Sequence, residues 1–391
     1  MDWKMLFNLN LNKGREKNMK IGITCYPTVG GSGVIATELG KMLAEKGNEI
    51  HFITSSLPFR LDKVYPNIFY HEVEMGHYPV FQYPPYDLAL ATKMADVIDQ
   101  EKLDVLHVHY AVPHAICAIL AKEMAEHDVK IVTTLHGTDI TVLGVDNTFK
   151  KMIKYGIEQS DAVTAVSNNL VEQTKDMLKT TKDISVIYNF INEQEYYRKD
   201  NKMLKREFGI SPNEKVVIHI SNFRKVKRVD LIVKTFNRIR SKVNSKLLLV
   251  GDGPEYSDIV QLVHKLGLND DVLFLGKQNN ISDLLSISDL MLLLSEKESF
   301  GLVLLEAMAC KVPCIGTNVG GIPEVIKHEE TGFIVKSGNI EQASNYAIKL
   351  FEDDKKLEQF SQNAYNHAKT TFKSEEIVNQ YTKLYFDVIK K

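Results

Sequence analysis

The stretch Leu290-Met-Leu-Leu-Leu-Ser-Glu-Lys-Glu298-Ser-Phe-Gly-Leu-Val-Leu-Leu-Glu306 decides the fold class, because a strand, a loop and a helix follow one another within it. Residues 290–294 are an unbroken apolar run, as expected of a strand buried on both faces. The polar loop after it carries Glu298, and Gly301 opens a helical segment that contains Glu306. A buried strand that leads into a helix is the repeating unit of a parallel α/β sheet.

The same alternation runs along most of the chain and predicts two α/β units. The first series of strands is expected at residues 20–25, 49–54, 104–108, 130–135, 162–165 and 184–188, and the second at 215–220, 246–250, 271–275, 290–294, 313–316 and 332–335. Helical segments lie between the strands. We therefore predict two Rossmann-like, doubly wound domains that face each other across a cleft, with ligands at the carboxyl ends of the strands.

The domain boundaries follow from where this rhythm starts, pauses and stops. Residues 1–18 carry an apolar patch before their cations, the reverse of a signal peptide, and we expect a disordered extension, with a membrane-surface helix as the minor alternative. The first domain is then 19–192 and the second 193–373. Apolar residues at helical spacing predict a final helix over 374–391, for which packing back on the first domain is one option.

Composition excludes several classes of protein. The 391 residues include 48 Lys plus Arg and 50 Asp plus Glu, a net charge of −2, which argues against a nucleic-acid binder with a strongly basic surface. No apolar run reaches the length of a membrane span. Four cysteines in apolar surroundings form no disulfide framework and suit a reduced cytoplasm. The oligomeric state stays open, with a homodimer as one option.

Two motifs follow strands of the first domain. Gly30-Gly31-Ser32-Gly33 opens a helix, whose N–H groups suit an anion or sugar hydroxyls, although a tight turn without a ligand is the alternative because the spacing G-x-G-x-x-G is absent. His136 ends the strand at 130–135 and is followed by Gly-Thr-Asp. A lone histidine is more often structural, but this position at a strand end favours a functional role.

Two motifs of the second domain carry charge. The run Arg224-Lys-Val-Lys-Arg228 follows the strand at 215–220, where its cations would neutralise a diphosphate rather than form an ordinary solvated face. Glu298 and Glu306 have the form E-x7-E. On one helix they would be about 12 Å apart, too far to flank one anomeric carbon, so we expect them to hold two ends of an elongated ligand.

Together these motifs resemble the retaining glycosyltransferases of family 4, which have the GT-B fold, over nearly the whole chain from about Met19. The resemblance implies that Glu306 binds the nucleotide ribose, that Glu298 binds the donor hexose hydroxyls and that His136 lies beside the donor sugar. It implies catalytic roles for His136, Lys227, Arg224 and Glu298, and donor binding by a set that adds Gly31, Ser299, Phe300, Gly301 and Glu306 to Lys227, Arg224 and Glu298.

Segments at 23–33, 81–86, 107–114, 133–141 and 221–228 look like the members of this family that open bacillithiol biosynthesis. The likeness implies transfer of GlcNAc from UDP-GlcNAc to the hydroxyl of L-malate, with retention. For the acceptor we name Ser32, Tyr110 and Thr138. Enzymes of this kind usually need no metal, and no Asp-x-Asp metal motif stands at a strand end, so we expect no cofactor or metal. Cations and a helix N-terminus would stabilise the leaving UDP instead.

The sequence departs from the family pattern at two points. Many relatives have Gly-Arg where this chain has Ser221-Asn222, with a lysine five residues after the arginine. Here Asn222 replaces the arginine, whereas Lys227 keeps the place of the lysine. We therefore expect Arg224 to supply the second cation. Asn189-Phe190 stands where relatives often have Asn-Gly. Three alternatives stay open: another acceptor on the same fold, a UDP-GlcNAc 2-epimerase, and a non-enzymatic sugar-nucleotide binder.

Overall fold

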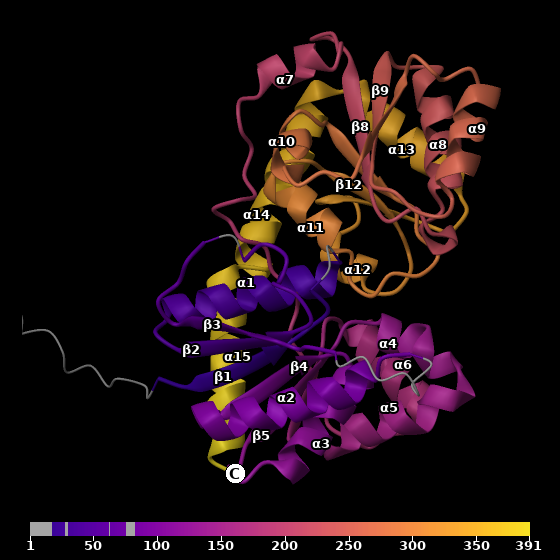
Figure 1. The fold of residues 1–391 in the computed structure, drawn as a ribbon. Helices are drawn as coiled ribbons and strands as arrows, with labels where there is room; N and C mark the ends of the chain where they lie inside the picture. The colour runs from indigo at the N-terminus through magenta and orange to yellow at the C-terminus, as the bar shows by residue number, and fades with distance from the viewer. Residues whose placement is uncertain (1–17, 28–29, 62, 76–82) are drawn as a thin grey trace, which may run out of the picture. The chain divides into compact units, whose positions relative to one another are not determined.

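A computed structural model describes residues 18–27, 30–61, 63–75 and 83–391 (Figure 1). The extension predicted at residues 1–18 therefore lies outside the described residues, apart from Asn18. By their contacts the residues group into two compact units. One holds the chain up to Thr134 together with 147–163 and 382–391, and the other holds 135–146 and 164–381.

The first sheet has the strand order β3-β2-β1-β4-β5-β6-β7. The pairs β1–β2, β1–β4, β2–β3, β4–β5 and β6–β7 are parallel. The strands are β1 (Lys20–Thr24), β2 (Glu49–Thr54), β3 (Ile68–Glu72), β4 (Val105–His109), β5 (Lys130–Leu135), β6 (Ala162–Ala165) and β7 (Ser185–Val186). The strand order changes direction between β1 and β4, which marks a switch point where open α/β sheets bind ligands.

Helices accompany this sheet along the chain. They are α1 (Gly31–Glu45), α2 (Tyr86–Glu101), α3 (Ile116–Met124), α4 (Thr138–Thr141), α5 (Asn147–Gln159) and α6 (Asn168–Leu178). Buried residues of α2 and α3, among them Leu90, Met94 and Ala118, pack with Leu106 of β4 in one apolar cluster. Burial of this apolar face, rather than helix propensity, supplies most of the stability of such helices.

The second sheet has six parallel strands in the order β10-β9-β8-β11-β12-β13. The strands are β8 (Lys215–Ile220), β9 (Ser245–Val250), β10 (Val272–Gly276), β11 (Leu290–Leu293), β12 (Cys314–Thr317) and β13 (Gly332–Val335). Counted from β8, this is the Rossmann order 3-2-1-4-5-6, so a second switch point lies between β8 and β11.

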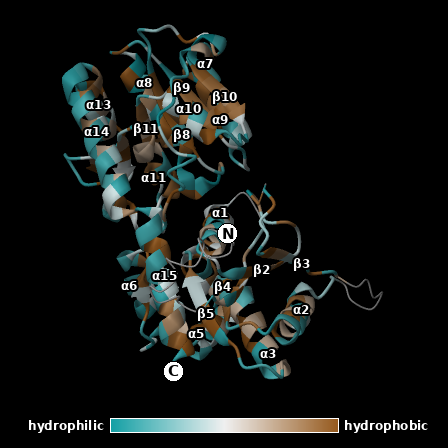
Figure 2. Cartoon of the chain, turned by 90° about the vertical axis from the view of Figure 1, so that its left-hand side faces the viewer, coloured by the Kyte–Doolittle hydropathy of each residue, from teal (hydrophilic) through white to brown (hydrophobic). Residues whose placement is uncertain are grey.

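The helices of this part are α7 (Lys202–Glu207), α8 (Val229–Arg240), α9 (Tyr256–Lys265), α10 (Ile281–Ser286), α11 (Leu302–Ala309), α12 (Ile322–Val325), α13 (Ile340–Phe351), α14 (Asp354–Thr371) and α15 (Ser374–Ile389). Phe236 of α8, Leu249 of β9, Ile259 of α9 and Ala347 of α13 share one buried cluster. Figure 2 shows the result, with hydrophobic colour concentrated on β8, β9 and β10 and hydrophilic colour on the outer faces of α13 and α14.

Each predicted strand is present within a few residues of its expected position, and so are the helix expected to open at Gly30–Gly33 and the final helix. One strand, β3, was not predicted. None of its residues is fully buried, because β3 is the edge of its sheet and lacks the apolar run that marks a buried strand. Among the described residues, no helix combines the length and apolar character that crossing a membrane requires.

The final helix α15 buries the apolar face that its spacing predicted. Ile377, Tyr381, Tyr385 and Val388 are buried. The Tyr385 hydroxyl lies 2.7 Å from Nδ1 of the buried His107 in β4, and both residues belong to the first unit. The last residues of α15 are thus grouped with the first unit, while the residues up to Tyr381 are grouped with the second.

Candidate active site

The loops after β8, β11 and β12 converge at the carboxyl edge of the second sheet, beside its switch point. The loop after β8 contains the short 3-10 turn η3 (Lys225–Lys227), and the loop after β11 leads through Glu298 into α11. The backbone N–H of Glu296 donates to the carbonyl of Val226 at 2.8 Å and ties the two loops together. Because β8 and β11 are neighbours at the switch point, residues far apart in the sequence meet here.

Lys227 and Glu298 form an ion pair between these loops. Lys227 Nζ donates to Glu298 Oε2 at 2.6 Å, and the two side chains keep only 21% and 15% of their exposure. Partial burial strengthens the attraction beyond that of a surface pair. The structure therefore brings together the cation expected beside a diphosphate and the carboxylate expected beside a hexose.

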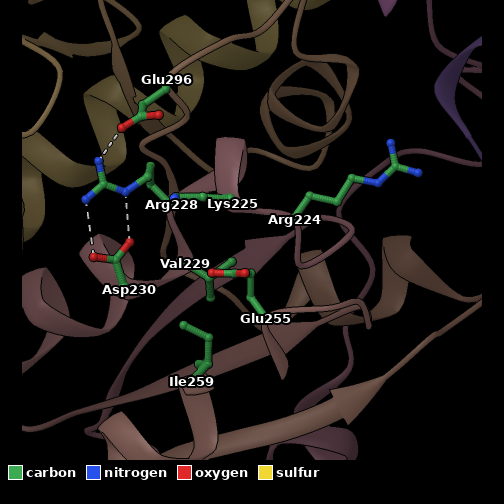
Figure 3. A pocket seen from close by; sticks show the side chains of 8 residues that line it. All are labelled: Arg224, Lys225, Arg228, Val229, Asp230, Glu255, Ile259 and Glu296. Atoms are coloured by element: carbon green, nitrogen blue, oxygen red, sulfur yellow. Dashed lines mark hydrogen bonds and ion pairs between the residues drawn. The ribbon is translucent and has the colours of Figure 1, made fainter. Parts of the chain in front are cut away.

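The other cations of the basic run have different surroundings. Arg228 adopts φ 49° and binds the carboxylates of Asp230 and Glu296, which hold its pKa above the usual value (Figure 3). Arg224 is exposed, and within the described part of the chain no carboxylate forms an ion pair with it. Figure 3 shows its side chain extended away from Arg228. Arg224 is thus the cation available for an incoming anion, whereas Arg228 is held by protein carboxylates.

A pocket of about 360 Å³ opens beside this basic run. Its walls come from η3, α8, α9 and the loop after β11: Arg224, Lys225, Arg228, Val229, Asp230, Glu255, Ile259 and Glu296. Its size falls within the range of small-molecule sites, about 300–1,000 Å³. Lys227 and Glu298 do not line it, so the pocket adjoins the ion pair and does not contain it.

Glycines allow three backbone segments to crowd around Glu298 and Ser299. A Cβ on Gly320 would lie 1.6 Å from the carbonyl oxygen of Glu298, and Gly320 adopts φ 54°. The N–H of Gly321 donates to the same carbonyl at 3.1 Å. A Cβ on Gly137, which adopts φ 111°, would lie 1.6 Å from the Ser299 hydroxyl. The residue after His136 is therefore packed directly against the residue after Glu298.

Two residues that the sequence did not single out for the site hold this loop in place. The Ser167 hydroxyl, which follows β6, donates to the carbonyl of Ser299 at 2.7 Å and accepts from the N–H of Leu170 in α6. The Glu324 carboxylate accepts from the backbone N–H groups of Asn168 and Asn169, at 2.9 and 3.0 Å. A carboxylate on the N-terminus of a helix is a favourable cap. The serine before α6 was the sequence signal for a helix cap at this position.

The helix that follows the loop carries the remaining predicted donor residues. Gly301 precedes α11 with φ 89°, and Glu306 lies within the helix and is 6% exposed. Phe300 is 2% exposed and packs against Tyr188 and Phe372, with ring centroids 6.0 and 5.7 Å away. The Phe300 side chain therefore anchors the loop in an aromatic cluster, and the donor contact of this residue stays a prediction.

The predicted acceptor residues Ser32 and Tyr110 meet at the switch point of the first sheet. The Tyr110 hydroxyl donates to the Ser32 hydroxyl at 3.0 Å, from the residue after β4 to the first turn of α1. Tyr110 adopts φ 90°, a strained conformation for a non-glycine residue, which costs on the order of 1–3 kcal/mol and is typical of functional sites. Gly31 begins α1 and is exposed.

The other two predicted residues of the first half lie after β5. His136 is half-buried, and Thr138 begins α4 and is exposed. Between them, the N–H of Gly137 donates to the Asp139 carboxylate at 2.9 Å, and Asp139 is fully buried. The turn that carries His136 is thus held by a hydrogen bond to Asp139 and by close packing against Ser299.

The cysteines show no sign of redox or metal chemistry. All four are free and buried, and burial raises the pKa of Cys25, Cys117 and Cys310 to about 12. A thiol must lose its proton to bind a metal or attack a substrate, so these side chains act as small apolar residues. Their burial agrees with the apolar surroundings expected from the sequence.

Solved structures define the class of protein to which this fold belongs. Sucrose-phosphate synthase from Thermosynechococcus elongatus superimposes with a TM-score of 0.81 at 21% identity, over 95% of this chain and all of that one. Anabaena HepE, solved in complex with UDP-glucose, superimposes with a TM-score of 0.80 at 21% identity, over 94% of this chain and 99% of that one. The fold is that of the GT-B glycosyltransferases, as predicted.

Sequence comparisons narrow the class to a family. A model described as Glycosyltransferase Family 4 matches residues 29–195, and a model described as Glycosyl transferases group 1 matches residues 200–367. The N-acetyl-alpha-D-glucosaminyl L-malate synthase of Bacillus anthracis is 61% identical over 95% of this chain and 98% of that protein. The chain therefore belongs to the family 4 glycosyltransferases and is an enzyme of that kind, which confirms the resemblance stated above.

A more distant relative is named for a different activity. The phosphatidylinositol N-acetylglucosaminyltransferase GPI3 subunit of Saccharomyces cerevisiae is 25% identical over 83% of this chain and 73% of that protein. That name implies another acceptor, so the acceptor of this chain is argued separately below.

Proposed function

We propose that this enzyme transfers GlcNAc from UDP-GlcNAc to the hydroxyl of L-malate with retention, the first step of bacillithiol biosynthesis. The observation that carries the proposal is the 61% identity to the Bacillus anthracis enzyme over nearly the full length of both chains. The paired residues at the two switch points, Lys227 with Glu298 and Ser32 with Tyr110, suit this reaction.

In this proposal the second sheet binds the donor. Lys227 and Arg224 neutralise the diphosphate, and the N-terminus of α11 adds its positive potential. Glu306 accepts hydrogen bonds from the ribose, and Glu298 from the hexose hydroxyls. The ion pair has a chemical consequence: Glu298 orients the Lys227 ammonium at 2.6 Å, so that the cation is already in place when charge develops on the leaving UDP.

The transfer itself proceeds on one face of the sugar. The bond from the anomeric carbon to the β-phosphate oxygen breaks, and the malate hydroxyl oxygen forms its new bond on the same side, so that configuration is retained. The freed phosphate oxygen takes the hydroxyl proton. His136 lies beside the donor sugar, on a turn that Asp139 and Ser299 fix in place.

No metal takes part in this scheme, because Lys227 and Arg224 supply the positive charge. We therefore expect EDTA to leave the transfer rate unchanged when it is assayed well below the melting temperature. Initial rates with EDTA, with Mg²⁺ and with Mn²⁺ test this. A rate that EDTA abolishes and Mg²⁺ or Mn²⁺ restores would contradict the scheme.

The deciding experiment is one incubation of the protein with UDP-GlcNAc and L-malate, read by mass spectrometry and by NMR of the anomeric proton. We expect an α-linked GlcNAc-malate and stoichiometric UDP. UDP released equally well without malate would favour a 2-epimerase. Transfer to another acceptor would leave only the family assignment. Binding of the donor without turnover would indicate a non-enzymatic binder.

The proposal also places the enzyme in the cytoplasm, where both substrates would be found. Whether it works as a monomer or as a homodimer is decided by size-exclusion chromatography with light scattering. The homodimer, one option left open by the sequence, is the assembly that this measurement tests.

A further inference from the structure

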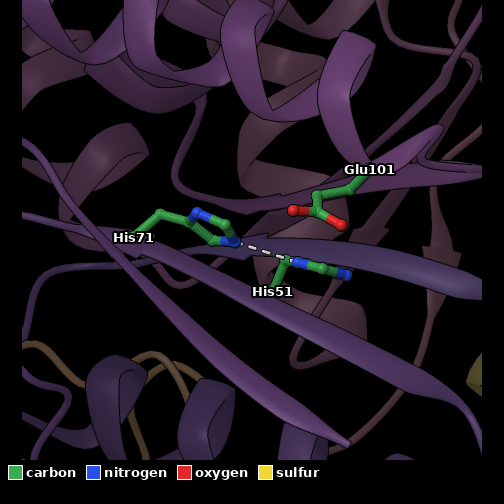
Figure 4. A group of neighbouring side chains, drawn as sticks. All are labelled: His51, His71 and Glu101. Carbon is green, nitrogen blue, oxygen red and sulfur yellow. Dashed lines mark hydrogen bonds between the residues drawn. The ribbon is translucent and has the colours of Figure 1, made fainter.

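A separate group of potential ligand atoms lies in the first unit, at the edge of its sheet. His51 of β2, His71 of β3 and Glu101 at the end of α2 each offer one ligand atom, and these atoms lie within 4.8 Å of one another (Figure 4). His51 Nδ1 and His71 Nε2 are 2.9 Å apart. None of the three residues belongs to the candidate active site.

The strand register explains why the two histidines meet. His51 pairs with Phe69, and Ile53 pairs with His71, so His51 and His71 occupy diagonal positions on one face of adjacent strands. Side chains at diagonal positions of this kind are within reach when they are long or aromatic. In Figure 4 the Glu101 carboxylate reaches toward the same point from α2, which lies above the two strands.

The hydrogen bonds on the far side of His51 set its tautomer. Its Nε2 lies 3.0 Å from the carboxylate of Glu49, and Lys20 pairs with the same carboxylate oxygen at 2.8 Å. The ion pair with Lys20 keeps Glu49 in its ionised form. An ionised carboxylate only accepts, so Nε2 of His51 carries the proton and Nδ1 presents its lone pair to His71, on the side where the Glu101 carboxylate also lies.

This is the arrangement in which a protein histidine binds a metal. Metal-bound histidines almost always donate their other N–H to a carboxylate, carbonyl or water, which fixes the ring and raises its basicity. Without a metal, the His71 Nε2–H donates to His51 Nδ1. With a metal, the His71 proton moves to Nδ1, and Nε2 becomes a ligand.

We propose that His51 Nδ1, His71 Nε2 and Glu101 form a binding site for a divalent transition metal ion such as Zn²⁺, with Glu49 as the carboxylate that orients His51. Two imidazoles and a carboxylate suit Zn²⁺, whereas Mg²⁺ and Ca²⁺ prefer oxygen ligands. Tetrahedral Zn²⁺ would separate the two nitrogens by roughly 3.3 Å. The present 2.9 Å therefore needs a shift of only a few tenths of an ångström. The metal would join β2, β3 and the end of α2, independently of sugar transfer.

The test uses the untagged full-length chain and Zn²⁺ alone, with binding followed by calorimetry. Co²⁺ serves as the spectroscopic probe of imidazole ligation. We expect one equivalent of Zn²⁺ bound, a melting temperature that rises with Zn²⁺, and no effect of Mg²⁺. His71→Gln and Glu101→Gln should each weaken Zn²⁺ binding at least tenfold and alter the Co²⁺ spectrum. His264→Gln, which changes an exposed histidine of α9, should not.

Two results would overturn the proposal. One is a wild-type chain that binds no Zn²⁺ at millimolar concentration. The other is Zn²⁺ affinity in both site variants equal to that of the wild type and of His264→Gln, which would place the metal elsewhere. Should His71→Gln fail to fold, Glu101→Gln decides alone, because Glu101 is only half-buried at a helix end and its loss leaves the histidine pair intact.

Discussion

Two lysines near the second switch point, Lys225 and Lys227, lie in different surroundings and are expected to differ in their part in catalysis. Lys227 is half-buried against Glu298, whereas Lys225, two residues earlier in the same turn, is exposed. Both are cations of one motif in the sequence. The structure distinguishes them, because one is oriented by a carboxylate and the other faces solvent.

Lys227→Ala should therefore lower kcat by about a hundredfold or more and raise the KM for UDP-GlcNAc by less. Charge builds on the diphosphate as the glycosidic bond breaks, so an oriented cation contributes most in the transition state. Steady-state kinetics with saturating acceptor provide the measurement, and Lys225→Ala is the matched control, with near-normal values. A change in KM alone would reduce Lys227 to a ground-state contact.

Gly137 gives a second prediction about one position. Gly137→Ala puts a methyl group 1.6 Å from the Ser299 hydroxyl and forces a side chain into φ 111°. We expect a higher KM for UDP-GlcNAc and a melting temperature lower by a few degrees, from strain on the order of 1–3 kcal/mol. Gly209→Ala is the control, since Gly209 also has a positive φ but would meet nothing within 4 Å. Equal kinetic effects of the two variants would contradict a specific contact at Ser299.

How much of the site was predictable depends on how its residues are connected. Lys227 and Glu298 were recognisable because each stands in a local motif after a strand, and their meeting follows from the neighbouring positions of β8 and β11. Ser167 and Glu324 were not predicted as parts of the site. They act on residues 132 and 155–156 positions away, and although Ser167 is recognisable locally as a helix cap, the local sequence does not show which distant residues these two contact.

Strands and helices follow a similar rule. The buried strands were predictable because they are apolar on both faces, and β3 was missed because an edge strand is not. The apolar pattern that marks a buried strand does not reveal polar residues that are buried within it. His219 of β8 is fully buried, with Nδ1 2.8 Å from the Leu292 carbonyl and Nε2 2.8 Å from the Ser221 hydroxyl.

Because of His219 in β8, the stability of the folded protein is expected to depend on pH. Burial, the largest cause, and the nearby Lys227 lower its pKa from 6.5 to about 4. The unfolded chain therefore takes up a proton near pH 6.5, while the folded chain does not until about pH 4. Stability present above pH 6.5 is lost as the pH falls to about 4, by on the order of 3 kcal/mol for this group.

Unfolding followed by circular dichroism in urea, between pH 7 and pH 4, measures this dependence. His219→Asn keeps an N–H for the Leu292 carbonyl but cannot be protonated, so its stability should fall less over this range than that of the wild type. The exposed His264 is the site for the control, since His264→Asn should follow the wild-type curve. Parallel curves for wild type and His219→Asn would show that His219 is not the titrating group.

The chain as a whole repeats one topology, with a switch point in each sheet. The sequence predicted this because the strand rhythm restarts near residue 200, and the two family models divide at the same place. It did not predict that α15 is shared between the two compact units, since helical spacing shows which face is apolar but not what covers it.

The acceptor preference tests whether the first sheet binds the acceptor while the second sheet binds the donor. At the first switch point, Tyr110 and Ser32 are hydrogen-bonded at 3.0 Å beside the N-terminus of α1, and within the described residues no side chain caps that helix and no acidic residue lies in its first turn. The N–H groups of a helix N-terminus, with hydroxyls beside them, favour a carboxylate. A dicarboxylate acceptor with a hydroxyl should therefore be preferred over neutral alcohols.

The panel is L-malate, D-malate, succinate and inositol phosphate, each with UDP-GlcNAc. L-malate should exceed D-malate in kcat/KM by at least about tenfold, because one enantiomer alone seats both carboxylates and still aims its hydroxyl at the anomeric carbon. Succinate has no hydroxyl and should compete with malate without being glycosylated. Ser32→Ala should raise the KM for malate and leave donor binding intact, since Ser32 belongs to the first sheet's site. Transfer to inositol phosphate at the rate seen with L-malate would defeat the acceptor assignment, because a site that admits a bulky cyclic phosphate equally well cannot be selecting two carboxylates on a short chain.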